Sequence, residues 1–166
     1  VNADYREIRP AVIYAPARVC MLDIECEDQR GFPEPTRDAI ICITCWDSYL
    51  DRYVTFFSPF PGQEEGATQL ESATPKPSGC FDPQHHEVKV YSTETEMLKG
   101  FVSYIRETDP DILSGWNFLE FDLPYIKRRM EALSLSPAML ARLEGDVERL
   151  AIRGRATFDL LPAYRK

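Results

Sequence analysis

Apolar residues occur along the chain with two different periods, and each period predicts a different kind of element. Three short apolar runs, at residues 19–25, 39–46 and 53–57, have the length and the aliphatic and aromatic content of buried strands. The polar link at residues 47–52 predicts a hairpin between the second run and the third. The chain is therefore expected to begin with a strand meander.

A helical period follows further along the chain. Thr93 and Glu96 form a capping box, and Asp109 followed by Pro110 is expected to end the helix. Its apolar face comprises Met97, Leu98, Phe101, Val102 and Ile105. The next apolar run, residues 111–116, predicts a strand. A strand so soon after a helix favours a crossover and a parallel pairing.

A second helix is predicted to begin at Asp122, which we interpret as its N-cap, with Pro124 in the first turn. Leu123, Ile126, Met130 and Leu133 make its apolar stripe, and Arg128 and Arg129 are expected on its exposed side. Residues 137–150 have a helical pattern, and residues 157–160 suit a short last strand. The order βββ–α–β–α predicts an α/β fold, a mixed sheet flanked by helices.

Residues 58–87 differ from the rest of the chain. Pro, Gly, Ser, Thr and Glu dominate, no period is visible, and we expect an exposed surface insertion before a short strand at 88–91. Cys80, His85 and His86 lie in it. They could bind a metal, but a polar loop tip is the favoured interpretation.

Composition is that of one globular domain. The chain has 166 residues, 44% of them hydrophobic and 28% charged, so residues 1–166 can bury a core as a single domain. No apolar run reaches the roughly 18 residues that a membrane helix needs. We therefore expect no membrane association.

Five cysteines, an odd number, favour a reducing compartment over a disulfide framework. Cys42 and Cys45 form a CxxC pair, but positions i and i+3 of a strand point to opposite faces. We interpret both as small apolar strand residues rather than as ligands of one ion.

The net charge of −8 counts against a simple nucleic-acid-binding domain, which usually carries a basic surface. Two explanations can coexist. A metal-dependent nuclease must gather carboxylates in its site, and an acidic surface is also common in proteins from a salty cytoplasm. If the chain is part of a larger protein, other domains could supply a basic track for DNA.

Asp23 and Glu25 stand two positions apart at the end of an apolar strand, so both side chains project from one face. Two neighbouring carboxylates repel each other, and a hard divalent cation such as Mg²⁺ or Mn²⁺ would relieve the repulsion. The alternative is a strand end that meets solvent. Asp122 lies where a helix follows a strand, so its carboxylate is expected near the same end of the sheet, with Asn117 in the loop before it.

Longer strings of residues make a specific resemblance. Leu22-Asp23-Ile24-Glu25 resembles the first exonuclease motif of family B DNA polymerases, and Asn117 to Phe121-Asp122 resembles the second. The lead-in Asp-Pro-Asp-Ile-Leu-Ser-Gly-Trp-Asn at 109–117 and the string Gly-Arg-Ala-Thr-Phe-Asp-Leu at 154–160 are also similar to that family. The resemblance covers residues 18–166, apart from the 58–87 insertion, and favours the archaeal branch.

The resemblance implies a ribonuclease H-like fold and a proofreading 3'→5' exonuclease domain of a DNA-directed DNA polymerase, with two-metal hydrolysis of the 3'-terminal phosphodiester. It implies that Asp23, Glu25 and Asp122 bind two Mg²⁺ or Mn²⁺ ions and carry the catalysis. Asn117 and Phe121 would hold the 3' end of the strand. We expect the three carboxylates to converge on a common metal position.

The resemblance also implies partners and a location. The partners are a single-stranded 3' end of DNA and the remaining polymerase domains, with a sliding clamp as a further candidate. The location is cytoplasmic and nucleoid-associated if the source is archaeal or bacterial.

The third motif of that family, Tyr-x-x-x-Asp, does not occur in these 166 residues. We interpret the chain as a fragment without that motif and without the polymerase domains, and expect the fragment to be weakly active or inactive. Two alternatives stay open, a non-catalytic nucleic-acid-binding or structural module on the same fold and a stand-alone ribonuclease H-like nuclease.

Overall fold

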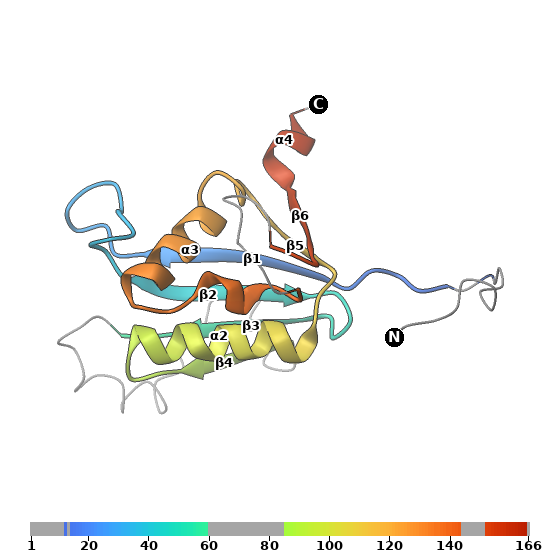
Figure 1. The fold of residues 1–166 in the computed structure, drawn as a ribbon, viewed down its shortest axis with the longest axis horizontal. Coiled ribbons are helices and arrows are strands. Elements are labelled where there is room, and N and C mark those ends of the chain that lie inside the picture. Colours follow the sequence, from blue (N-terminus) through green and yellow to red (C-terminus); the bar gives the residue numbers. More distant parts are fainter. Residues whose placement is uncertain (1–11, 13, 60–84, 144–151, 166) are drawn as a thin grey trace.

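The computed structural model describes residue 12 and residues 14–59, 85–143 and 152–165. Within this part of the chain, six strands form one sheet in the order β4-β3-β2-β1-β5-β6 (Figure 1). The strands are β1 (Val19–Cys26), β2 (Ile40–Asp47), β3 (Arg52–Phe57), β4 (His86–Val90), β5 (Ile112–Gly115) and β6 (Ala156–Asp159). The β1–β2 and β2–β3 pairs are antiparallel, whereas β3–β4, β1–β5 and β5–β6 are parallel. The predicted mixed sheet, its hairpin and its parallel crossover are thus confirmed.

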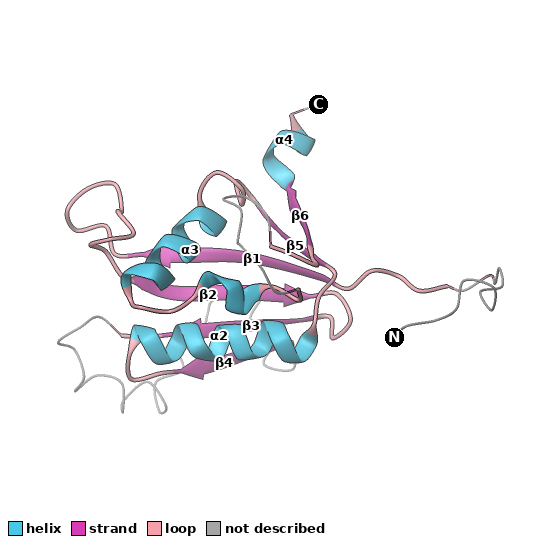
Figure 2. Ribbon diagram, in the orientation of Figure 1, coloured by secondary structure: helices cyan, strands magenta, loops and turns pink. Residues whose placement is uncertain are grey.

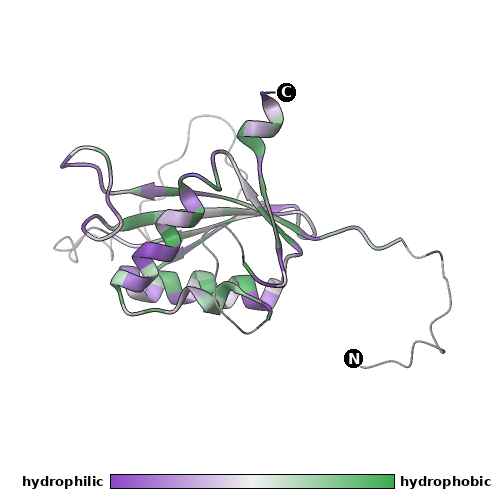
Figure 3. Cartoon of the chain, turned by 45° about the horizontal axis from the view of Figure 1, so that its top comes forward, coloured by the Kyte–Doolittle hydropathy of each residue, from purple (hydrophilic) through white to green (hydrophobic). Residues whose placement is uncertain are grey.

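Helices α2 (Glu94–Thr108) and α3 (Asp122–Ala132) pack on one face of the sheet (Figure 2). Their ribbons alternate between hydrophobic and hydrophilic colours, as the predicted amphipathic patterns require (Figure 3). The Thr93 side chain accepts a hydrogen bond from the Glu96 N–H, and Asp109, the C-cap of α2, adopts the left-handed conformation. A short 3-10 helix η3 (Pro137–Leu140) and a last helix α4 (Leu160–Tyr164) complete the described elements.

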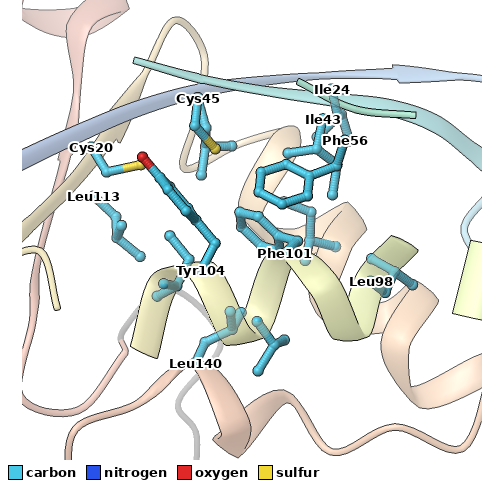
Figure 4. Packing of buried hydrophobic residues seen from close by; sticks show 14 of the residues in the cluster. Cys20, Ile24, Ile43, Cys45, Phe56, Leu98, Phe101, Tyr104, Leu113 and Leu140 are labelled. Atoms are coloured by element: carbon cyan, nitrogen blue, oxygen red, sulfur yellow. The ribbon is translucent and has the colours of Figure 1, made fainter. Parts of the chain in front are cut away.

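The core lies between the sheet and these two helices. Phe56 of β3 packs its ring 5.8 Å from that of Phe101 and 5.5 Å from that of Tyr104, both on α2 (Figure 4). On β1, Leu22 and Ile24 are buried in this core. Side chains alternate along a strand, so the residues between them face the other side of the sheet.

Two sequence predictions about segments are wrong in detail. The helix expected at 137–150 is only a 3-10 helix that ends at Leu140, and residues 144–151 lie outside the described residues. The Arg142 N–H donates to the Arg153 carbonyl at 2.9 Å, so it does not continue a helix from Leu140. Strand β4 begins at His86, so the last residues of the expected 58–87 insertion are strand residues, and residues 60–84 lie outside the described part.

Four cysteines are described, and all four are free thiols. Cys45 is buried in the core, whereas Cys42 lies on the opposite face of β2, where its Sγ contacts the Thr44 hydroxyl. The prediction that the CxxC pair cannot hold one ion together is therefore in keeping with the strand geometry. In the part of the chain that the structure describes, no helix is long and apolar enough to cross a membrane.

Candidate functional site

Asp23 and Glu25 both lie exposed on the sheet face away from the helices. They alternate with the buried Leu22 and Ile24, as the strand period predicts. Across the β1–β2 pair, Asp23 stands opposite Thr44. The ladder shifts register between Glu25 and Cys26, so the strand changes course directly after the acidic pair.

Asp122 is not the N-cap that its position in the sequence suggested. It is the first residue of α3, and the N-cap, Phe121, makes no side-chain capping bond. The Asp122 Oδ1 instead accepts a hydrogen bond of 3.1 Å from the backbone N–H of Ile24. This bond fixes the start of α3 against β1, beside Asp23 and Glu25.

The environment of Asp122 disfavours a negative charge. The side chain is 1% exposed, and its Oδ2 is buried without a hydrogen-bond partner. Burial, and after it the negative charge of Asp23, raise the pKa of this carboxyl group from its ordinary value to about 7. A cation near Asp23 and Asp122 would relieve both effects and give Oδ2 a partner, so this pair suits a hard divalent ion.

Asn117 and Phe121 lie in the loop between β5 and α3. Asn117 adopts the left-handed conformation with φ 59°, and its carbonyl accepts a hydrogen bond of 2.9 Å from the Phe121 N–H. Both side chains are half-buried. The turn therefore presents them at the end of the sheet, directly before Asp122.

Phe32 is a candidate residue that the sequence interpretation missed. Its side chain is 82% exposed, and its ring lies 5.8 Å from that of Phe121 in an edge-to-face arrangement. It belongs to the loop after β1, which Figure 1 shows beyond the end of that strand. An aromatic residue among Gly31, Pro33 and Pro35 was the signal that could have found it.

The base of this loop is fastened to α3. The Arg129 guanidinium donates to the Pro35 carbonyl at 3.2 Å, and the Tyr125 hydroxyl donates to the Asp38 carbonyl at 2.9 Å. Arg129 also makes a paired contact with Glu94 of α2, at 2.8 and 2.7 Å. The expectation that Arg129 is exposed is therefore wrong, whereas Arg128 is exposed as predicted.

The three carboxylates do not converge as the sequence analysis expected. Among the described residues, no group of three or more His, Cys, Asp or Glu side chains is placed to hold a metal ion. One oxygen of Asp122 is engaged by the Ile24 N–H, and the side chains of Asp23 and Glu25 are exposed. What the structure brings together is the pair Asp23 and Asp122. His85 and His86 likewise join no such cluster in the described residues.

Comparisons with known proteins agree on one family. Residues 2–166 match the family described as DNA polymerase family B, exonuclease domain. The chain is 32% identical over 172 residues to a DNA polymerase delta catalytic subunit of Oryza sativa subsp. japonica, covering 92% of the chain and 14% of that protein. It is 29% identical over 171 residues to the DNA-directed DNA polymerase of Escherichia phage RB69, covering 90% of the chain and 19% of that protein.

The fold has a solved counterpart as well. The chain is similar to the solved structure of the family B DNA polymerase from the archaeon Pyrobaculum calidifontis, with a TM-score of 0.64 and 25% sequence identity. The match covers 95% of this chain and 17% of that polymerase. The relatives include proteins of plants, mammals, a phage and archaea, so they do not single out the archaeal branch that the sequence analysis favoured.

Proposed function

This chain belongs to the family B DNA polymerases, as their exonuclease domain, and we propose that it removes nucleotides from the 3' end of a DNA strand by hydrolysing the terminal phosphodiester. The observation that carries the proposal is the Asp122 carboxylate, buried and bonded to the amide between Asp23 and Glu25. The chain spans less than a fifth of the relatives described above. We therefore also propose, from these relatives, that the parent protein adds nucleotides to DNA.

The proposed site uses Mg²⁺ or Mn²⁺, two ions in its complete form. Asp23 and Asp122 are the first ligands, because their mutual repulsion and the unpartnered Oδ2 are what a cation relieves. Glu25, on the same face as Asp23, is the third. When bound, such ions lower the pKa of a water molecule and stabilise the oxygen that leaves.

Side chains of the protein itself would orient the attacking water and hold the DNA strand. Glu25 orients the attacking water and receives a hydrogen bond from it, because it is exposed at the strand end beside Asp23. Asn117 and Phe121 hold the 3'-terminal nucleotide, Asn117 through its amide and Phe121 through its ring. Phe32 offers a second aromatic face to the same strand.

The proposed substrate is a single-stranded 3' end, and the remaining polymerase domains are the first partners. With a net charge of −8 this chain attracts DNA poorly, so those domains would provide the basic track that brings the strand to it. A sliding clamp is a further proposed partner, and the proposed location is with the DNA of the cell.

The test uses the full-length parent polymerase with Asp23 and Glu25 both replaced by alanine. Release of nucleotides from a labelled single strand in Mg²⁺ should fall at least about a thousandfold, while nucleotide addition stays near wild type, because the two reactions use separate sites. Asp28→Ala, an exposed acid in the turn after β1, is the matched control and should keep both activities. Wild-type release by the double variant would leave the chain as a non-catalytic module on this fold.

A further inference from the structure

Asp159 is the last residue of β6, at the same end of the sheet as the candidate site. It pairs with Gly115 of β5 in the parallel ladder, and its side chain is 7% exposed. Its two carboxylate oxygens accept different backbone amides. Oδ2 accepts from Leu119 N–H and Oδ1 from Leu161 N–H, each at 2.9 Å.

The two bonds have different structural meanings. The Leu161 bond is local, since Asp159 is the N-cap of α4. The Leu119 bond joins residues 40 positions apart and reaches into the loop 116–121. That loop carries Asn117 and Phe121 and leads directly into Asp122.

The two ends of the loop are tied to β1. At Gly115, a Cβ would lie 2.4 Å from the Leu22 carbonyl oxygen, so only glycine allows β5 to approach β1 this closely. At the other end, Asp122 bonds to the Ile24 N–H. Between them, the Leu119 amide is held from the opposite side, by β6.

We propose that Asp159 is a positioning residue for the nuclease site, an inference that rests on the function proposed above. Its carboxylate fixes the middle of loop 116–121, so that Asn117 and Phe121 face the 3' end while Asp122 keeps its place on β1. A carboxylate is suited to this task because it offers one full acceptor oxygen to each of two amides. Asparagine offers one acceptor oxygen, and serine offers an oxygen too close to the backbone to reach Leu119.

A serine at position 159 separates the two roles of Asp159, the bond to Leu119 and the N-cap of α4. Asp159→Ser keeps an N-cap for α4, because serine caps helices about as well as aspartate, but removes the bond to Leu119. In the full-length polymerase without metal, hydrogen exchange read at single amides should quicken at least about tenfold at Leu119 and stay unchanged at Leu161. With Mg²⁺, the rate of 3' nucleotide release at saturating single-stranded DNA should fall about tenfold, while nucleotide addition is unchanged.

Two further variants keep the result interpretable. Thr93→Ala removes the N-cap of α2, far from the loop in the sequence, and should lower the melting temperature without changing the release rate. If Asp159→Ser does not fold, Asp159→Asn, which keeps the volume and one acceptor oxygen, takes its place. Whichever of the Leu119 and Leu161 amides loses its acceptor oxygen exchanges faster, and the release rate should fall only where the loss is at Leu119. Faster Leu119 exchange together with slower release supports the proposal.

Two outcomes would contradict the positioning role of Asp159. Faster Leu119 exchange with an unchanged release rate, or slower release with unchanged exchange, overturns the positioning role. Failure of the proposed function is a separate outcome: the alanine variant at Asp23 and Glu25 would then release nucleotides like wild type. The exchange measurement needs no activity, so it reports on the Asp159 bond in either case.

Discussion

The Asp122 carboxylate and the Ile24 backbone N–H are hydrogen-bonded at 3.1 Å across 98 positions of the sequence. The Ile24 side chain points into the core, and its N–H lies between two acidic residues. The hydrogen bond from the Ile24 amide holds Asp122 near Asp23 and uses only one of the two carboxylate oxygens of Asp122. The other oxygen stays buried and available.

The first prediction concerns pH. The Asp122 pKa is about 7 in the folded chain, against an ordinary value of 3.8. The folded state therefore keeps a proton that the unfolded state releases, and this stabilisation is lost as pH rises from about 4 through 7. In EDTA, the 166-residue chain should lose on the order of 3 kcal/mol between pH 4 and 8 from this group, roughly 10 °C in melting temperature.

Asp122→Asn provides the comparison, because asparagine resembles the neutral carboxyl group. Its melting temperature should exceed that of wild type at pH 8 and approach it at pH 5. Asp28→Asn removes one exposed negative charge nearby and should leave the pH dependence as in wild type. Parallel curves for wild type and Asp122→Asn would mean that Asp122 is already ionised at low pH.

The second prediction concerns the Arg129–Glu94 pair, which is mostly buried and also supports Pro35. Among the described residues, Arg129→Ala leaves Glu94 with the Ile40 N–H as its remaining hydrogen-bond partner, so it should destabilise the chain by about 3 kcal/mol. Arg128→Ala, at the exposed neighbour, should cost less than about 0.5 kcal/mol. Urea denaturation of both variants measures the difference, and equal losses would contradict the buried pair.

That pair also illustrates what the sequence could not predict. The apolar stripe of α3 was readable from its spacing, because burial of Leu123, Ile126 and Met130 follows one helical face. Arg129 stands beside that stripe, and its burial depends on Glu94 of another helix and on a loop carbonyl. Contacts of this kind arise from tertiary packing and leave no local pattern.

In the candidate site, too, local patterns predict some features, and others depend on tertiary contacts. The shared face of Asp23 and Glu25 follows from strand alternation alone. Asp122 was predicted near them, but as an N-cap, since local rules favour an aspartate there. In the structure the Asp122 carboxylate accepts the long-range hydrogen bond from the Ile24 N–H, and the N-cap of α3 is Phe121. Phe32 escaped notice because nothing in its loop indicates that it would lie against Phe121.

The third prediction concerns Phe32. Its ring is exposed and touches Phe121, so it can stack on a base without contributing much to the core. In the full-length polymerase, Phe32→Ala should weaken single-stranded DNA binding to the exonuclease site roughly tenfold, since base stacking is worth about 1–3 kcal/mol. Its melting temperature should change little. Tyr49→Ala, an exposed aromatic in the β2–β3 link, is the control, and an equal loss of affinity there would refute a specific role for Phe32.

The last prediction concerns the 166-residue chain by itself. In the described residues, the charge of Asp23 raises the pKa of Asp122, but no set of three acidic, histidine or cysteine side chains is placed around one position. Mg²⁺ gives up its water reluctantly and needs near-ideal octahedral geometry, so a pair of carboxylates holds it weakly. Two-metal hydrolysis needs both ions. We therefore expect millimolar or weaker Mg²⁺ binding by calorimetry and little release of nucleotides from single-stranded DNA.

A longer chain should restore the activity. The family's Tyr-x-x-x-Asp motif, absent from these residues, would add one carboxylate ligand and a hydroxyl to orient the water. A chain extended to include it should bind Mg²⁺ more tightly and degrade single-stranded DNA, and Asp122→Asn should abolish both gains. If the 166-residue chain already digests single-stranded DNA as fast as the extended one, and Asp23→Ala removes that activity, three carboxylates suffice. The geometry around Asp122 must then change when metal and DNA bind.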